Sequence, residues 1–325
     1  MIIINKIMSF TNILFRSLEL ILVLYILCFF LLNNIQKRIY IEALKNYSLL
    51  LNVYSKYDQY KIIDYIIVTA ILFVYPFIAN IHKIGGSIVA NYLFALTNKD
   101  KGAEFIKKVE SKYTWKKLFI ENNIPTNKVI YVSENGVISY SDNEVVKEQP
   151  DNTEFILKPL YGERGYGVEK GTLDELLKMN YENFIIEEFN KDCFIKEDHF
   201  RKFRINTLYN GRLMMVKEVK TTNPIVSSSD KLNEISIRIC ENHECNFLSP
   251  KEISILEKAT ATLSNLHKEK VSYCFTIGWD VMLTCENDEQ FLVIEGNNAH
   301  GMVGINKKDF YTEMEHFIDL NKVFE

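Results

Sequence analysis

The sequence lacks several features that would assign it to a common class at once. It has no basic excess, because 38 Lys and Arg stand against 42 Asp and Glu, for a formal net charge of −4. A nucleic-acid-binding domain usually carries a basic patch or stripe. Six cysteines are present without the spacing of a disulfide framework: Cys28, Cys193, Cys240, Cys245, Cys274 and Cys285. We therefore expect no nucleic-acid partner, and thiols that are reduced and mostly structural.

Common metal and nucleotide signatures are missing as well. Cys240, His243 and Cys245 have neither a fourth ligand nor a paired Cys-x-x-Cys, so a structural zinc site is not expected. No Gly-Lys-Ser/Thr opens a helix, which excludes a P-loop. No internal repeat or low-complexity tract stands out, which leaves an ordinary folded domain as the expectation.

A lysine followed by a glycine-rich loop is the first positive signal. The apolar run 155–157 predicts a strand that ends in Lys158, and Gly162, Gly165 and Gly167 follow. Glycines let backbone N–H groups approach a phosphate closely, and a lysine supplies a point charge beside it. A tight β-turn is the alternative. Because more strand is predicted over 168–171 and a helix begins only at Thr172, the loop does not fit a dinucleotide-binding fingerprint.

Two later strands deliver oxygen groups out of apolar surroundings. Asp280 lies in the run 277–283, and Glu295 and Asn297 end the run 291–297. Residues two apart on a strand share a face, so Glu295 and Asn297 can point at the same ion. Two carboxylates and an amide are the donors that a hard cation such as Mg²⁺ prefers. The alternative is a hairpin whose acidic residues face solvent.

Further charged residues lie between these segments. The strand predicted over 183–189 ends in Glu187 and Glu188. Asn210-Gly211, between alternating apolar runs, predicts a hairpin with a type I′ turn. Arg204 points to the opposite face from Phe203 and Ile205. For Arg201, Lys202 and Arg204 the alternative is an exposed strand face.

In this order the residues resemble the ATP-grasp superfamily over about the last 225 residues. The matching pieces are the Ser111-Lys112 helix, Lys158 with its glycine loop, the Glu187-Glu188 strand, Arg204, and the set Asp280, Glu295 and Asn297. The phrases 203–208, 278–281 and 294–297 look most like the sugar-transfer-associated ATP-grasp branch, whose members are associated with polysaccharide gene clusters. The resemblance implies an α+β fold of two lobes with ATP between them.

The resemblance also implies a role for each matching residue. Lys112 and Lys158 would contact ATP phosphates, and Gly162, Gly165 and Gly167 would form a mobile lid. Glu187 and Glu188 would lie on the strand that runs beside the adenine and ribose. Arg204 would stabilise charge on the transferred phosphoryl group, and Asp280, Glu295 and Asn297 would hold Mg²⁺. The implied reaction activates a carboxylate as an acyl phosphate for attack by an amine.

The chain departs from the family pattern in two places. Ser111 precedes Lys112 where aspartate is frequent, and the early sheet domain is replaced by residues 1–98. Leu20 to Gln36 and Tyr65 to Ile81 are uncharged runs of about the minimum length for a membrane-spanning helix. We expect a hydrophobic helical segment over 1–98 that contacts the membrane, with the domain 99–325 at its cytoplasmic face. Two helices buried against that domain are the alternative.

Other elements follow from local signals. Helices are predicted over 101–122, over 309–321, and from Ser249-Pro250-Lys251-Glu252 to about Lys268. A hairpin is predicted around Asn135-Gly136, a loop over 141–153, and a second mobile lid over 217–230. Three functions remain open. They are a ligase acting on a small-molecule or glycan-linked carboxylate and an amine acceptor, a phosphotransferase to a sugar or hydroxyl, and a non-catalytic ATP-binding membrane adaptor. Lys217 and Lys220 would bind the acceptor carboxylate of the ligase, and His300 would be the base of the phosphotransferase.

Overall fold

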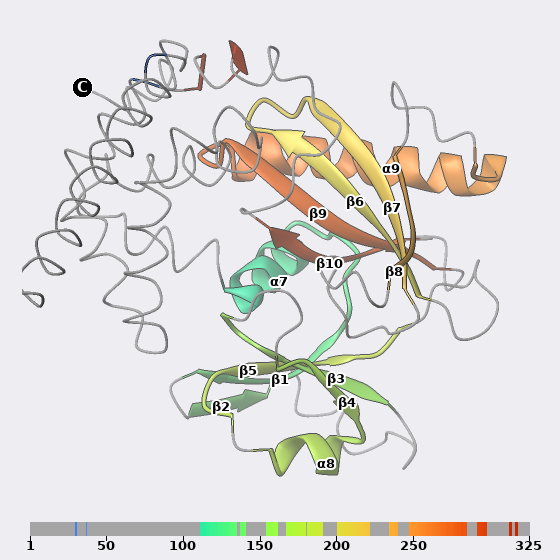
Figure 1. Cartoon of the computed structure of the whole chain (residues 1–325). Coiled ribbons are helices and arrows are strands. Elements are labelled where there is room, and N and C mark those ends of the chain that lie inside the picture. Colours follow the sequence, from blue (N-terminus) through green and yellow to red (C-terminus); the bar gives the residue numbers. More distant parts are fainter. Residues whose placement is uncertain are drawn as a thin grey trace, which may run out of the picture. The chain divides into compact units, whose positions relative to one another are not determined.

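The computed structural model describes thirteen parts of the chain: residues 30, 37, 111–134, 137–140, 154–161, 167–179, 181–190, 200–221, 234–239, 247–284, 291–297, 312–313 and 316–317. The chain forms two compact units, Met1–Ala103 with Gly301–Glu325, and Glu104–His300. All elements named below belong to the second unit (Figure 1).

Several sequence predictions lie outside the described residues. They are most of both apolar runs, 20–36 and 65–81, the first two glycines of the loop, the loop 141–153, His300, and the second lid beyond 221. Within the predicted closing helix 309–321, the described residues 312, 313, 316 and 317 are helical. Among the residues described, no helix has both the length and the apolar character needed to cross a bilayer.

The first sheet has five antiparallel strands in the order β2 (Val137–Tyr140), β1 (Val129–Glu134), β5 (Phe184–Glu188), β3 (Phe155–Pro159), β4 (Glu169–Gly171). Its strands are apolar on both faces because both faces are covered. One face packs Phe155, Leu157 and Ile186 against Leu176, and the other carries Ile185 and Leu160. The hairpin around Asn135-Gly136 is confirmed by the pairing of β1 with β2.

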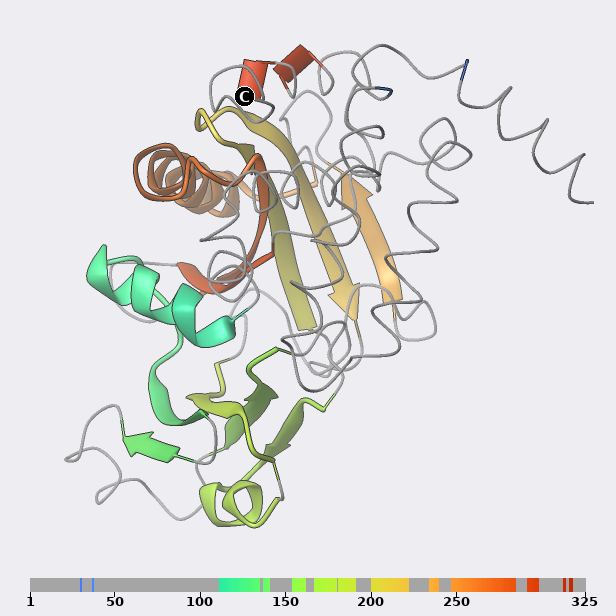
Figure 2. The same ribbon diagram turned by 90° about the vertical axis from the view of Figure 1, so that its left-hand side faces the viewer.

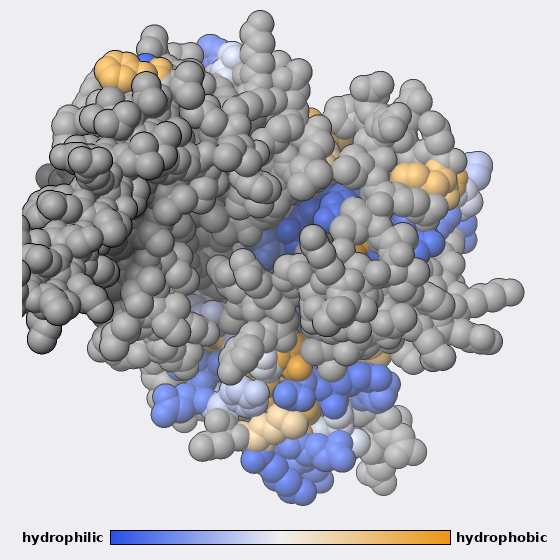
Figure 3. Space-filling view, viewed as in Figure 1, coloured by the Kyte–Doolittle hydropathy of each residue, from blue (hydrophilic) through white to orange (hydrophobic). Residues whose placement is uncertain are grey.

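Helix α8 (Leu173–Leu177) follows β4, as predicted. Its start is fixed by Glu175, whose carboxylate accepts from the backbone N–H of Thr172 at 2.9 Å. Leu176 is buried in the core of the first sheet, whereas Asp174 and Lys178 are exposed. The surface over α8 is accordingly hydrophilic (Figure 3).

The second sheet also has five antiparallel strands, in the order β10 (Phe291–Asn297), β9 (Thr276–Leu283), β6 (Phe200–Leu208), β7 (Leu213–Thr221), β8 (Glu234–Ile239). Helix α9 (Pro250–Lys270) lies along one face (Figures 1 and 2). Trp279 is fully buried on that face, with its ring against Trp115, Phe119 and His267. The two sheets and their helices confirm the α+β class.

The structure shows how helices α7 (Lys112–Glu121) and α9 begin. Ser249 caps α9 and Glu252 completes a capping box, as predicted, and the helix ends at Lys270. Helix α7 begins after Ser111, so one continuous helix over 101–122 is not formed, and the predicted part over 101–110 lies outside the described residues. Ser111 has extended backbone and its hydroxyl accepts from the Thr114 N–H, which makes it the N-cap.

The turn between β6 and β7 differs from the predicted type I′ turn. That turn needs positive φ at both central residues, and among residues 208–212 positive φ occurs at Gly211 alone (φ 82°). The Gly211 N–H donates to the Leu208 carbonyl at 2.8 Å, which closes a three-residue loop. A Cβ on Gly211 would lie 2.8 Å from the Ser264 carbonyl of α9. The positive φ of Gly211 in this three-residue loop and its close approach to α9 therefore both favour glycine.

Candidate active site

Two lysines and one glutamate form a buried cluster on one face of the first sheet, at its inner strands β3 and β5. In the β3–β5 register Ile156 lies opposite Glu187, so Lys158, two residues on, shares the face of Glu187. The Lys158 Nζ donates to Glu187 Oε2 at 2.8 Å, and Lys116 of α7 lies 3.2 Å from the same oxygen. All three side chains are buried. One carboxylate thus serves two ammonium groups, which leaves a net positive charge for a further anion.

The pKa directions of the three groups follow from this sharing. Burial raises the pKa of Glu187, but Lys116 and Lys158 outweigh it and the pKa ends below its ordinary value. Burial lowers the pKa of Lys116. The attraction of Glu187, which also pairs with Lys158, does not compensate, so the pKa falls to about 8. For Lys158 burial is outweighed by Glu187, Glu295 and Asp280, and its pKa is raised. Glu295 and Asp280 belong to the second sheet, so both sheets face one charged site.

Lys116 is the residue that the sequence analysis missed. Its Nζ donates to Thr126 Oγ1 at 2.6 Å, and Thr126 donates to the Val293 carbonyl of β10 at 2.6 Å. Lys112, chosen from the motif, is one turn earlier and only half-buried, with its backbone N–H donating to Leu160. The available signal was the helical spacing, since Lys116 lies between Trp115 and Phe119 on the buried stripe of α7.

The other residues chosen on the first sheet are partly separated. Glu188 follows Glu187 on β5 and therefore points to the opposite face. Gly167 has φ 70°, and a Cβ there would lie 2.8 Å from the Pro159 side chain, so this end of the loop requires glycine. Gly162 and Gly165 are outside the described residues.

On the second sheet, Arg204 and Asp280 form the centre of a charged row. The register places Glu295, Asp280, Arg204 and Lys217 side by side across β10, β9, β6 and β7. Opposite residues of antiparallel strands share a face. Arg204 donates two hydrogen bonds to Asp280, from Nε to Oδ1 and from Nη2 to Oδ2, the latter at 2.9 Å. Burial raises the pKa of Asp280, but Arg204 and Lys202 hold it well below its ordinary range.

Glu295 and Asn297 lie together beside this row. Asn297 Nδ2 is 3.4 Å from Glu295 Oε1, as expected for residues two apart on β10. Among the described residues, no three His, Cys, Asp or Glu side chains converge as a metal cage. Two carboxylates and an amide instead fit Mg²⁺, which is commonly held by one or two carboxylates together with substrate phosphates. The donor chemistry therefore fits a cation that is completed by oxygens of another molecule.

A buried amide extends the same face. Asn206 follows Arg204 by two residues, is 0% exposed, and neither its Oδ1 nor its Nδ2 has a hydrogen-bond partner. In register it lies between Gly278 of β9 and Met215 of β7. In the sequence, only its spacing of two residues from Arg204 would point to Asn206.

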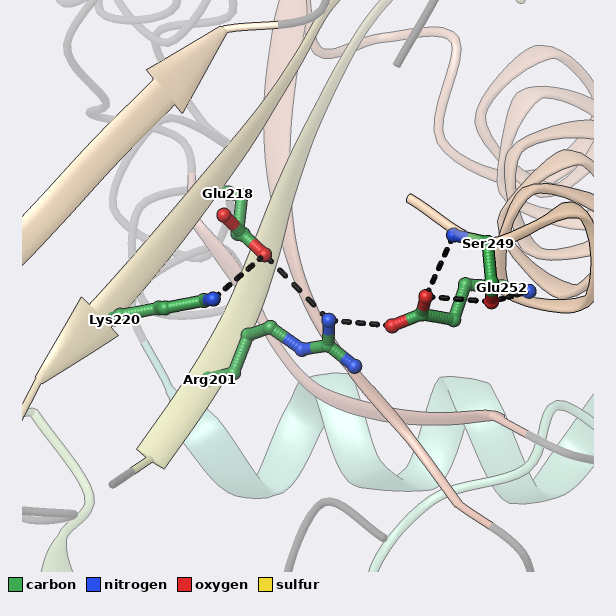
Figure 4. Close-up of polar contacts among 5 residues, drawn as sticks. All are labelled: Arg201, Glu218, Lys220, Ser249 and Glu252. Carbon is green, nitrogen blue, oxygen red and sulfur yellow. Dashed lines mark hydrogen bonds and ion pairs between the residues drawn. The ribbon is translucent and has the colours of Figure 1, made fainter. Parts of the chain in front are cut away.

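The two lysines proposed for the acceptor are not brought together. Lys217 shares the row of Arg204, whereas Lys220 lies on the α9 face opposite Arg201. There Arg201 bonds Glu252 at 2.5 Å and lies 3.5 Å from Glu218, and Lys220 lies 3.9 Å from Glu218 (Figure 4). Lys220 therefore belongs to a network that attaches α9 to β6 and β7.

No family model matches the chain, and no curated protein matches it. Several solved structures are similar at low identity. D-cycloserine synthetase aligns with a TM-score of 0.46 and 12% identity, over 70% of this chain and 78% of that one. D-alanine–D-alanine ligase from Bacillus anthracis aligns at 0.45 and 16%, over 66% and 69%. L-amino acid ligase from Bacillus licheniformis aligns at 0.40 and 15%, over 66% of this chain and 48% of its own length.

Proposed function

We propose that the chain is an ATP- and Mg²⁺-dependent ligase of the ATP-grasp superfamily. It would activate a carboxylate as an acyl phosphate, which an amine then attacks. The observation that carries this proposal is a buried site whose charges match a polyphosphate. Lys116, Lys158, Lys202 and Arg204 provide four positive charges, against three from Glu187, Asp280 and Glu295.

Each group has a task in this proposal. Lys116 and Lys158 donate to phosphate oxygens, and Glu187 keeps both ammonium groups in place when no phosphate is bound. Arg204, a planar two-pronged donor, faces charge that develops on the transferred phosphoryl group. Glu295 and Asn297, with Asp280 beside them, hold the metal. Mg²⁺ supplies charge neutralisation and alignment of the phosphate oxygens when bound.

The substrate and its place in the cell remain part of the proposal. The carboxylate and amine belong to small molecules or to a glycan precursor of cell-surface polysaccharide synthesis. The chain would act at the cytoplasmic face of the membrane, through residues 20–36 and 65–81. Both statements rest on the sequence patterns alone.

The first test measures melting of the full-length protein with Mg²⁺ and ATP. Ligand at 100 times its dissociation constant adds about 2.7 kcal/mol to the free energy of unfolding. We expect a Mg²⁺-dependent shift that disappears in Lys158→Met and persists in the control Lys170→Met. Lys170 pairs on the surface with Glu154, so it tests the loss of a lysine away from the site. Absence of a shift in a folded wild-type protein would reject the proposal.

A second assay separates the ligase from a phosphotransferase. Hydroxylamine attacks an acyl phosphate and gives a hydroxamate, which forms a coloured complex with added Fe³⁺, whereas a phosphorylated hydroxyl does not react. The wild-type protein is incubated with ATP, Mg²⁺ and hydroxylamine, together with a panel of carboxylates in one series and a panel of sugars in another. Hydroxamate formed in step with ADP supports the ligase, and ADP released with a stable phosphorylated sugar supports the phosphotransferase.

A further inference from the structure

Lys202 is a second cation on Asp280, and the proposed function counts its charge without giving it an individual task. It lies two residues before Arg204 on β6 and therefore on the same face. Its Nζ donates to Asp280 Oδ2 at 3.0 Å, and its side chain is 22% exposed. Asp280 itself is only 1% exposed. The lysine therefore reaches a buried carboxylate from the solvent side.

The hydrogen bonds of Asp280 leave little room for a metal. A carboxylate has about four lone-pair positions. Oδ2 accepts from both Arg204 Nη2 and Lys202 Nζ, and Oδ1 accepts from Arg204 Nε. These three bonds leave about one position, on Oδ1. A cation that needs Asp280 as a ligand must compete with an ammonium and a guanidinium already in place.

The local charge is also balanced without a metal. Asp280 and Glu295 carry two negative charges, and Lys202 and Arg204 carry two positive charges. Both cations contact Asp280, and Arg204 also interacts electrostatically with Glu295. A free divalent cation would enter a site without net negative charge, because Lys217 in the same row and Lys158 add further positive charge. It would meet repulsion from Lys202 and Arg204. A polyphosphate changes that balance, since it supplies negative charge to which Lys202 and Arg204 can turn.

We propose that Lys202 is an internal counter-cation that holds Asp280 when no metal is bound, so that the site takes Mg²⁺ together with a polyphosphate and rejects Mg²⁺ alone. The inference deepens the proposed function and rests on it for the polyphosphate. Lys202 determines specificity for the metal–nucleotide complex, and after displacement it offers an ammonium to the phosphate beside Arg204.

The opposite face of the same strands provides a matched control. Lys220 also lies close to a buried carboxylate, at 3.9 Å from Glu218, and its side chain is 29% exposed. Its network belongs to the α9 contact (Figure 4), and the strand register places it on the face away from Asp280. Lys220→Gln removes the same charge from the same sheet without touching Asp280.

The experiment measures binding of Mn²⁺, a paramagnetic substitute for Mg²⁺, to the full-length protein by electron paramagnetic resonance without nucleotide. We expect weak binding by the wild type, binding tighter on the order of tenfold in Lys202→Gln, and no change in Lys220→Gln. The gain should disappear in Lys202→Gln/Asp280→Asn. Equal affinity of Lys202→Gln and the wild type would overturn the proposal, as would an equal gain in Lys220→Gln.

Two additions keep the outcome clear. Lys202→Met repeats the test with an apolar side chain of similar length, and a melting curve without ligand confirms that each variant is folded. Melting with Mg²⁺ and ATP is measured on the same samples. A wild type that shows no shift rejects the ligase proposal, while the Mn²⁺ comparison still decides whether Lys202 competes with a metal for Asp280.

Discussion

The buried amide of Asn206 lowers the stability of the folded protein, because neither of its polar atoms has a hydrogen-bond partner. Its amide is completely buried with both polar atoms unpaired, and an unsatisfied buried group costs about 1–3 kcal/mol. Leucine has nearly the same shape without polar atoms. We expect Asn206→Leu to raise the free energy of unfolding by about 1 kcal/mol in urea titrations. The variant should lose activity, because the amide lies on the face of Arg204. A lower stability would show that the amide is satisfied in solution.

Glu187 has the opposite character, because it is the shared partner of two buried ammonium groups. Glu187→Gln keeps the shape but leaves Lys116 and Lys158 facing each other without a carboxylate. Removing one partner of a buried ion pair costs about 3–5 kcal/mol, and we expect a loss in this range by urea denaturation. Glu188→Gln is the matched control, since Glu188 is the next residue on the other face. It should cost about 1 kcal/mol or less, and equal losses would contradict the cluster.

At the scale of elements, the N-terminus of α9 is fixed by reciprocal bonds. The Ser249 hydroxyl accepts from the Glu252 N–H at 3.3 Å, and the Glu252 carboxylate accepts from the Ser249 N–H at 2.8 Å. Loss of such a cap costs about 1 kcal/mol, so Ser249→Ala should lower the melting temperature. Thr262→Ala, on the exposed side of the same helix, is the control. Alanine is the better helix former there, so this change should be neutral or stabilising.

The elements that the sequence predicted well are those with local causes. The cap of α9, the alternation of Arg204 with Phe203 and Ile205, and the strands predicted over 277–283 and 291–297 all follow from neighbours in the chain. Lys116 could not be chosen over Lys112 from local pattern alone, because its partners Glu187 and Thr126 become neighbours only in the folded chain. The type I′ turn predicted at Asn210-Gly211 is wrong. The close approach of Gly211 to Ser264 of α9 likewise exists only in the folded chain.

Across the whole molecule, buried carboxylates set the response of stability to acid. The pKa values of Glu187, Asp280 and Glu252 all lie below their ordinary values: burial raises each, but cations and hydrogen bonds outweigh it. A group whose folded pKa is depressed contributes stability above its unfolded pKa, near 4. That stability is lost as the pH falls through the folded pKa. We therefore expect a plateau of stability between about pH 5 and 8 and a steep loss below about pH 4.

The lysines decide the alkaline side of the same profile. The pKa of Lys116, lowered to about 8, is below its unfolded value, so the unfolded chain binds more protons and stability rises between about pH 8 and 10. The raised pKa of Lys158 acts in the other direction, but only as the pH rises past about 10. Melting temperatures at constant ionic strength from pH 2.5 to 9.5 measure both limbs.

Lys116→Met separates the two lysines in that profile. The variant should lose the rise in stability above pH 8 and keep the loss of stability at low pH. There, each carboxylate that is ionised in the folded protein and protonated in the unfolded chain changes the free energy of unfolding by about 1.4 kcal/mol per pH unit. Because methionine carries no charge, Glu187 would then serve Lys158 alone and would keep its depressed pKa. If stability still rises above pH 8 in Lys116→Met, the rise comes from another group. Glu187 is then not divided between two buried ammonium groups.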